Sequence, residues 1–411
     1  MDDPGSRALE YGQRAADDPA TRVTQDRVTS EGALAYASIN ADGEESPGGG
    51  GSSATLPLPW PPVLDARLTA VPKSHLLQTA LDVVAAGTAK RKNIAFAIVD
   101  LTEAGTRSYV GAHDKEQRFI ASTGKLAILF AAFQLRKSVR EAAALITDKA
   151  IKTDLQLFAA ILRPWRREIA RFFKGGEGSE NSLPSLAEIF TATPRPAGGW
   201  QVEFADTPRG GTGLAFTDRL RSAVTDSDDP NAGKCISLLG FPYIHGCMVK
   251  AGFWARGKGL WLSLNYWGVL WWKDAVKEFG TAQGSTAHVL AQVLTLLEFD
   301  ELVPGNRTEM IELLAGARAG RTVPALSFVT QGLLGYLPEA EKGTLDVRSK
   351  VGFIDKPGTS CDAAIVRHDS AGTALRYVVV ILNAENDEVA RDAARALDIA
   401  IATIHKPPPP P

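Results

Sequence analysis

Apolar residues recur at two spacings along the chain, and these spacings predict helices and strands in separate regions. A helical spacing of leucines and valines over about 74–91, behind a capping Ser74, predicts a first helix, and a similar pattern over 387–405 predicts a last one. Short apolar runs predict strands at 93–101, 106–111, 345–353, 362–368 and 375–383. Because strands occur at both ends with helical segments between them, we expect an α+β fold whose antiparallel sheet is built from both chain ends and flanked by helices.

Composition along the chain sets the boundaries of this domain. Residues 1–62 are rich in Asp, Glu, Gly, Ser and Pro and end in Leu-Pro-Leu-Pro-Trp-Pro-Pro, which predicts a disordered or extended segment. Residues 407–411 form a proline tail that cannot continue a helix. We therefore expect one domain over 63–406, in which a helical region of about 122–315 is inserted between the two halves of the sheet.

The overall composition argues against several classes of partner. The chain has Lys+Arg 45 and Asp+Glu 47, and this net charge of -2 offers no basic excess for nucleic acid. No apolar window is long enough for an integral membrane segment. The cysteines and histidines show no ligand spacing, and G-x-S-x-G, H-E-x-x-H and C-x-x-C do not occur, so we expect neither a metal nor a cofactor.

A serine and a lysine stand together at the head of an apolar run. Ser122 and Lys125 are three residues apart, and apolar residues continue to Phe133. On a helix these two positions share a face, so the lysine amine comes within reach of the serine hydroxyl. A buried lysine with a lowered pKa can take the serine proton and make the hydroxyl a nucleophile. The same spacing also arises at ordinary helix starts, where the serine caps the helix, so the pair needs support from other segments.

Further segments support the catalytic interpretation in order. The motif A-S-T-G-K-L at 121–126 resembles the nucleophile motif of the serine β-lactamases and penicillin-binding proteins, and 216–240 resembles the class A helix–loop–helix that carries S-D-N. Residues 284–315 resemble the later helical pair of that class, and S-K-V-G-F at 349–353 resembles its K-T-G strand. The resemblance covers about 70–406 and implies a β-lactamase/transpeptidase-like fold. It also suggests a periplasmic or secreted protein, although the visible start lacks the features of a signal peptide.

The resemblance implies a role for each matching residue. Ser122 would be the nucleophile, Lys125 its base, and Ser227 the hydroxyl that relays a proton to the leaving group. Lys350 would orient the substrate, and the backbone N–H groups of Ser122 and Phe353 would form the oxyanion hole. The substrate-binding positions would be Asp229, Asn231, Val351 and Gly352.

The chain also departs from the family pattern. In the loop S-D-D-P-N at 227–231, the family's asparagine is either replaced by Asp229 or displaced to Asn231. Val351 stands where the family has a hydroxyl residue that helps to bind a substrate carboxylate. No E-x-x-L-N segment occurs between Asn231 and Lys350, where class A enzymes hold the glutamate that activates the deacylating water. Rapid turnover of penicillins is therefore not implied.

These features together predict a serine acyl hydrolase. We expect it to act on an amide, β-lactam or ester through a Ser122 acyl-enzyme, with a small molecule or a peptide as substrate. A D,D-peptidase, transpeptidase or small-molecule esterase using the same site is one alternative. A non-catalytic binding protein that keeps the fold is another. The substrate, the oligomeric state and the compartment stay open.

Overall fold

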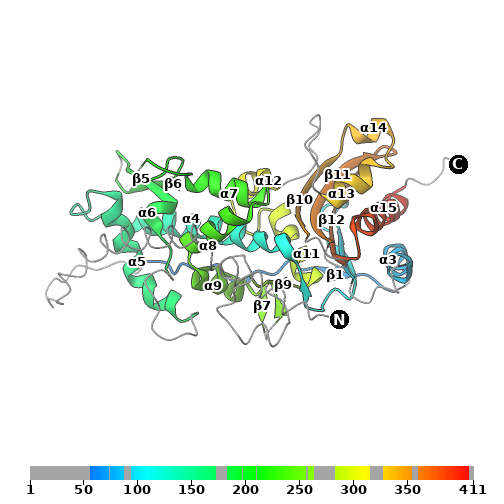
Figure 1. Ribbon diagram of the computed structural model, residues 1–411, viewed down its shortest axis with the longest axis horizontal. Coiled ribbons are helices and arrows are strands. Elements are labelled where there is room, and N and C mark those ends of the chain that lie inside the picture. The colour runs from blue at the N-terminus through cyan, green and yellow to red at the C-terminus, as the bar shows by residue number, and fades with distance from the viewer. Residues whose placement is uncertain are drawn as a thin grey trace.

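The molecule has a sheet covered by helices at one end and a group of helices at the other, as Figure 1 shows. The computed structural model describes residues 56–73, 75–87, 94–172, 183–196, 198–209, 211–255, 258–262, 283–314, 327–353 and 360–406. Helix α4 (Lys125–Leu145) runs from the sheet into the helical end. This arrangement confirms the predicted α+β class.

The main sheet joins the two ends of the described chain. Its six strands lie in the order β1-β3-β2-β12-β11-β10. They are β1 (Thr69–Ala70), β3 (Ser108–Ala112), β2 (Ala95–Asp100), β12 (Thr373–Ala384), β11 (Ser360–Ser370) and β10 (Asp346–Gly352). Strand β1 pairs with β3 in parallel, and the other pairs are antiparallel. The central pairing sets Ala97 of β2 opposite Val380 of β12, so the sheet is assembled from both ends as the strand pattern predicts.

The two faces of the sheet belong to two different cores. Successive side chains of a strand point to opposite faces. Phe96 and Ile98 of β2 therefore pack in a core with α3 (Leu76–Gly87), α13 (Phe328–Leu334) and α15 (Asp387–Ile404). Val99 points the other way, into a core shared with α11 (Ala287–Glu298) and the helical end. Side chains from the end of β10 can thus reach either the first core or the helical end, depending on their position in the strand.

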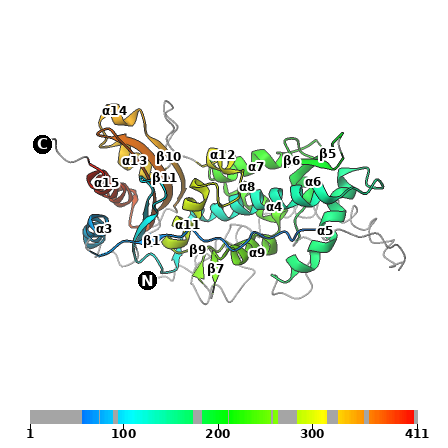
Figure 2. The same ribbon diagram turned by 180° about the vertical axis from the view of Figure 1, so that it is seen from behind.

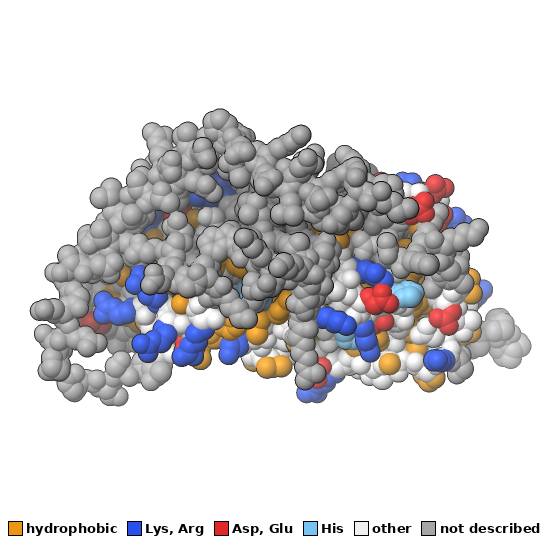
Figure 3. All heavy atoms as spheres, turned by 60° about the horizontal axis from the view of Figure 1, so that its bottom comes forward, with side chains coloured by type: hydrophobic (Ala, Val, Ile, Leu, Met, Phe, Trp, Pro, Cys, Tyr) orange, Lys and Arg blue, Asp and Glu red, His pale blue; other side chains and the backbone are white. Residues whose placement is uncertain are grey.

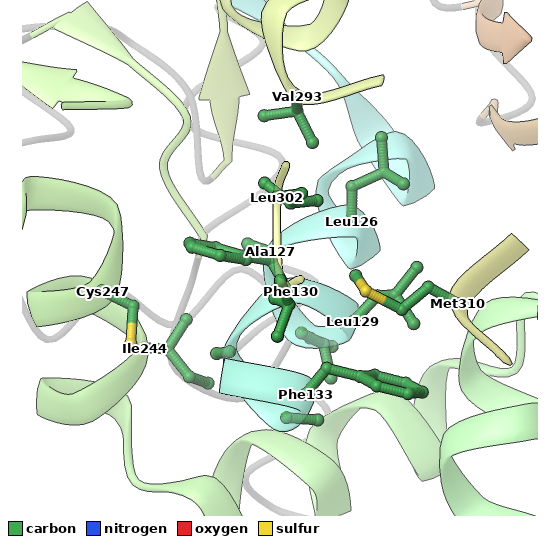
Figure 4. Packing of buried hydrophobic residues seen from close by; sticks show 14 of the residues in the cluster. Leu126, Ala127, Leu129, Phe130, Phe133, Ile244, Cys247, Val293, Leu302 and Met310 are labelled. Carbon is green, nitrogen blue, oxygen red and sulfur yellow. The ribbon is translucent and has the colours of Figure 1, made fainter. Parts of the chain in front are cut away.

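The helical end is organised around α4. Most residues of this helix are buried, because apolar side chains surround it rather than forming one stripe. In Figure 4 its Phe130 lies close to Ile244 of α9 (Phe241–Ala251), and Met310 of α12 (Arg307–Glu312) approaches its Leu129. The remaining helices are α5 (Asp154–Ala170), α6 (Leu186–Ile189), α7 (Phe216–Val224), α8 (Asp229–Leu239) and α14 (Glu339–Lys342). Short strand pairs are β4 (Arg118–Phe119) with β9 (Gly284–Ser285), β5 (Phe190–Pro194) with β6 (Trp200–Phe204), and β7 (Trp254–Ala255) with β8 (Lys258–Gly259).

The proline-rich stretch before β1 is extended and packed on the helical end. Figure 2 shows it running from near α5 along the helices to the sheet. Trp60 stacks on Tyr243 with 5.6 Å between ring centroids, and the Pro57 carbonyl accepts a 2.8 Å hydrogen bond from Trp165 Nε1. Residues 56–62 therefore contribute to the fold through these contacts. Proline favours an extended backbone, and the half-buried Trp60 ring holds it in place.

Basic side chains lie on the outer surface of α5. Arg163, Arg166 and Arg167 are exposed, whereas Trp165 of the same helix is buried. Figure 3 shows Lys and Arg side chains gathered toward that end of the molecule. Across the described part of the chain, no helix combines the length and the apolar character that a membrane span requires.

Candidate active site

Ser122 lies in a tight turn directly before α4. The turn is the short helix η1 (Ala121–Gly124), and the N-cap of α4 is Gly124, which makes no side-chain capping hydrogen bond. Ser122 therefore does not have the capping role that its spacing would also have allowed. The preceding Ala121 has a φ of 44°, a conformation that is unfavourable for a residue with a Cβ. Such strain persists only where the surrounding structure holds it, and it is common next to reactive groups.

The amine of Lys125 is completely buried one turn along the chain from Ser122. Its side chain is 0% exposed, and Nζ donates to the backbone carbonyl of Ser227 at 2.5 Å. Nζ also forms a 2.6 Å ion pair with Asp229 Oδ1 and lies 3.4 Å from Ser227 Oγ. The S-x-x-K lysine is thus held against the loop that the sequence identified as the second motif.

Lys350 reaches the same serine from the sheet. It lies in β10, is 0% exposed, and its Nζ donates to Ser227 Oγ at 2.8 Å and to the Val351 carbonyl at 2.9 Å. Ser227 itself has a φ of 62°, so its backbone is also strained. The structure therefore brings Lys125, Ser227 and Lys350 together, with one hydroxyl between two buried amines.

The end of β10 packs directly against the nucleophile turn. Thr123 Oγ1 donates to the Lys350 carbonyl at 3.3 Å. A Cβ added to Gly352 would lie 2.8 Å from the Ser122 backbone nitrogen and 2.5 Å from the Ile120 carbonyl oxygen, so only glycine fits at this contact. The backbone N–H of Ser122 therefore lies beside the strand end from which Phe353 follows.

Burial sets the protonation of the two lysines. Burial lowers the pKa of Lys125, while the Asp229 carboxylate acts in the opposite direction. Burial lowers the pKa of Lys350 to about 7, and the neighbouring Lys125 amine contributes to this shift. Because each charged amine disfavours the other, the pair holds its second proton weakly near neutral pH.

The structure distinguishes the two residues proposed for the family's asparagine position. Asp229 begins α8 and contacts Lys125. Asn231 lies two positions further along the helix, where its side chain contacts Arg219 at 3.3 Å and Ser222 at 3.3 Å. Residues two apart on a helix point to different sides. Asp229 therefore faces the lysines, and Asn231 does not.

Val351 lies away from the lysine cluster. Its side chain is 1% exposed and belongs to the core between the sheet and α13 and α15. Its neighbour Lys350 points to the other face because strand residues alternate. Of the substrate-binding positions predicted from the sequence, Val351 contributes only its backbone carbonyl here, and the exposed ring of Phe353 follows at the strand end.

Two residues that the sequence did not single out support the site. Gln283 is buried, and its Nε2 donates to the Ala121 carbonyl at 3.3 Å, next to the strained residue. Asp362 is completely buried opposite Val351 in β11, where burial raises its pKa although it accepts from Ser327 Oγ at 2.8 Å. The charge of Asp362 opposes the lowering of the Lys350 pKa. No sequence signal identifies Gln283, and the strand register sets Asp362 opposite Val351, on the α13 side of β10.

The remaining sequence observations concern metal binding and the missing glutamate. The described residues hold no group of three or more potential metal ligands. Much of the segment in which the E-x-x-L-N motif was sought, including residues 263–282, lies outside the described residues.

Comparison with known proteins gives structural similarity without sequence similarity. No family model matches the chain, and no curated protein matches it. Among solved structures, it is similar to a β-lactamase from Sphaerobacter thermophilus, with 16% identity, 83% of this chain and 100% of that chain covered, and a TM-score of 0.47. A β-lactamase from Burkholderia phymatum gives 16% identity, coverages of 79% and 99%, and a TM-score of 0.46. A class A β-lactamase from Mycobacterium abscessus gives 15% identity, coverages of 78% and 98%, and a TM-score of 0.46. These three solved structures are all β-lactamases.

Proposed function

We propose that the protein is a serine acyl hydrolase that cleaves an amide, a β-lactam or an ester through an acyl-enzyme at Ser122. The observation that carries this proposal is the pair of buried amines on Ser227, one of which stands a helical turn after Ser122. A serine hydroxyl needs a nearby base to react, and a buried, partly neutral amine pair is such a base.

Acylation follows from a proton relay through Ser227. Ser122 Oγ attacks the substrate carbonyl carbon and gives its proton to the neutral form of Lys125. Lys125 becomes neutral when its surplus proton passes through the Ser227 hydroxyl to Lys350, along the contacts of 3.4 Å and 2.8 Å. General-base catalysis of this kind typically contributes about 10²–10⁴-fold in rate. The Asp229 carboxylate keeps the Lys125 amine in place during the transfer.

Collapse of the tetrahedral intermediate completes the first half of the reaction. Backbone N–H groups of Ser122 and Phe353 stabilise the oxyanion, and each such donor typically contributes about 3–4 kcal/mol. The bond from carbonyl carbon to leaving group breaks, and Ser227 supplies the proton that the leaving group takes. Water then attacks the ester carbonyl carbon and gives a proton to the amine pair. The bond from that carbon to Ser122 Oγ breaks, and the amine pair passes the proton to Oγ as the acid is released.

The strained backbone of Ala121 and Ser227 supports the same interpretation. Each strained residue costs on the order of 1–3 kcal/mol, and both flank the groups proposed to react. A protein that only retained the fold would gain nothing by keeping two buried amines and two strained residues together.

Covalent labelling tests the proposed function. We expect a fluorophosphonate to add once to the purified protein and peptide mapping to place the adduct on Ser122. The Ser122→Ala variant should lose both labelling and hydrolysis of p-nitrophenyl esters.

Ser222→Ala is the matched control, because Ser222 lies on α7 and contacts Asn231 rather than the lysines. It should label and hydrolyse as the wild type does. Absence of label on Ser122 in the folded protein, or equal labelling of Ser122→Ala, would refute the proposed nucleophile.

A further inference from the structure

The charges around the proposed nucleophile are unevenly distributed between the buried and the accessible parts of the site. Lys125 and Lys350 are both 0% exposed, so their amines are enclosed by protein. The Asp229 side chain is 44% exposed, although one of its oxygens binds Lys125. The exposed charge described beside the two lysines is therefore a carboxylate rather than an ammonium.

Hydrogen-bonding chemistry strengthens this asymmetry. A carboxylate offers only acceptor atoms, so Asp229 binds a substrate group that donates hydrogen bonds or carries positive charge. The Val351 side chain is buried in the other core, and Lys350 is already bonded to Ser227, so neither offers a free group for a substrate carboxylate.

Of the described cations near α8, Arg219 points elsewhere, and Lys234 of α8 itself lies near Arg219 and Glu188. Arg219 binds the Leu214 carbonyl at 3.0 Å and Asn231 at 3.3 Å, on the side of α8 away from Lys125. An apolar surface is also present, because the Phe353 ring is 46% exposed at the end of β10 and is held edge-on by Phe328. The exposed charge described beside the lysines is thus the Asp229 carboxylate, and the Phe353 ring packs with Phe328 on the α13 side of the sheet.

We infer that Asp229 selects the substrate, so that the hydrolase accepts acyl groups carrying a positively charged or amine group and disfavours those carrying a carboxylate. This inference rests on the proposed function of Ser122. It predicts weak reaction with penicillins, which carry a carboxylate beside the reacting ring.

Three p-nitrophenyl esters of matched length distinguish the effect of the acyl group's charge on hydrolysis from the effect of its size. The probes are the ester of trimethylammonio-butanoic acid, its neutral tert-butyl isostere, and the monoester of a dicarboxylic acid of the same length. We expect the wild type to favour the cationic ester over the neutral one by about tenfold in kcat/KM, the difference that about 1.4 kcal/mol gives, and to disfavour the anionic ester. Added salt should reduce this preference because Asp229 is partly exposed.

Asp229→Asn keeps the shape of the side chain and removes its charge. Because Asp229 also contacts Lys125, all three rates should change together, but the ratio between the cationic and neutral esters should fall to about threefold or less. Asp226→Asn is the matched control, since it removes an exposed charge from the same loop, and it should leave the ratio close to that of the wild type.

The outcomes separate this inference from the proposed function. Loss of all ester hydrolysis in Ser122→Ala, with the charge ratio present in the wild type and lost in Asp229→Asn, supports both. Equal wild-type rates on the cationic and neutral esters, with Ser122 still labelled, would overturn the inference alone. An equal loss of preference in Asp226→Asn would overturn the assignment to Asp229. Failure of Ser122 to label would overturn both.

Discussion

In two buried ionic clusters of this protein, burial and neighbouring charges have opposite relative weights in setting the pKa values. Glu298, at the end of α11, is completely buried, and three arginines surround it. Arg376 Nε lies 2.5 Å from its carboxylate and Arg367 Nε 2.9 Å from it. Burial raises the pKa of Glu298, but the arginines outweigh burial and the pKa is lowered. In the lysine cluster the balance is reversed, because burial dominates and lowers both lysine pKa values.

This difference in charge compensation separates a cluster that stabilises the fold from the cluster to which the proposed function assigns proton transfer. Glu298 ties α11 to β11 and β12 through a fully compensated charge. Lys350 is held by a hydroxyl and a carbonyl, which are neutral acceptors, and described carboxylates influence it only from a distance. A compensated charge resists loss or gain of a proton, whereas an uncompensated one exchanges it readily. The proposed mechanism therefore assigns proton transfer to the lysine cluster.

Removing the carboxylate from the compensated cluster should have the largest effect on stability. Glu298→Gln leaves Arg307, Arg367 and Arg376 without their shared counter-charge. We expect a loss of about 3–5 kcal/mol in the free energy of unfolding, as for other broken buried ion pairs. Urea denaturation followed by circular dichroism measures it.

The control for this change is Glu301→Gln, because Glu301 is 44% exposed and pairs with Arg107 alone. An exposed pair should cost less than about 1 kcal/mol. Similar losses in the two variants would remove the contrast between the compensated cluster and the surface.

Replacing Lys350 should raise the free energy of unfolding, whereas replacing Glu298 should lower it. Lys350→Met removes a buried amine, and such replacements are often stabilising by about 1–4 kcal/mol. The pKa of Lys350 is about 7 when folded and higher when unfolded, so between these values the unfolded chain binds more protons and wild-type stability rises with pH. The advantage of Lys350→Met should therefore shrink between about pH 7 and pH 10. Denaturation at several pH values tests this, and ester hydrolysis should be lost.

A Lys350→Met variant that unfolds more easily than the wild type near neutral pH would show that the hydrogen bonds of Lys350 outweigh its desolvation.

The pH dependence of hydrolysis tests whether the lysine pair exchanges a proton near neutral pH. The reaction needs the amine pair with one proton removed, so kcat/KM should rise with pH about tenfold per unit below a midpoint near the Lys350 pKa of about 7 and level off above it. Asp362→Asn removes a charge that raises the Lys350 pKa, so the midpoint should move to lower pH. A flat profile across neutral pH would contradict a titrating lysine pair.

A second compensated carboxylate gives the smallest expected effect. Asp398 of α15 accepts from Tyr377 at 2.5 Å and from Tyr336, and it contacts His368 Nε2 at 2.8 Å. Tyr336→Phe removes one of these partners, so the free energy of unfolding should fall by about 1 kcal/mol with hydrolysis unchanged. Thermal unfolding and ester assays measure the two effects. A change in hydrolysis would link α15 to the site.

The sequence predicted the elements of the fold more completely than the contacts between them. Strands expected at 93–101 and 375–383 form β2 at Ala95–Asp100 and β12 at Thr373–Ala384. Such elements depend on local spacing of apolar residues, which a single sequence displays. The arginines around Glu298 come from distant segments, and nothing local in the sequence indicates that they meet.

The candidate site shows the same division. Motif order identified Ser122, Lys125, Ser227 and Lys350, and the structure brings Lys125 and Lys350 together on Ser227. The choice between Asp229 and Asn231 required knowing that α8 begins at Asp229, because helix start decides which side chain faces Lys125. Burial of the Val351 side chain likewise depends on which face of β10 meets the core.

The strand order described above also determines when the site can form during synthesis. Ser122 and Lys125 leave the ribosome well before β10, β11 and β12 are made. Until the late strands pair with β2, Lys350 is not in contact with Ser227, and the pair of amines is incomplete. Pairing between distant segments is a slow and late step of folding. A nascent or truncated chain therefore carries an ordinary, unreactive serine, and closure of the sheet converts it into the proposed nucleophile.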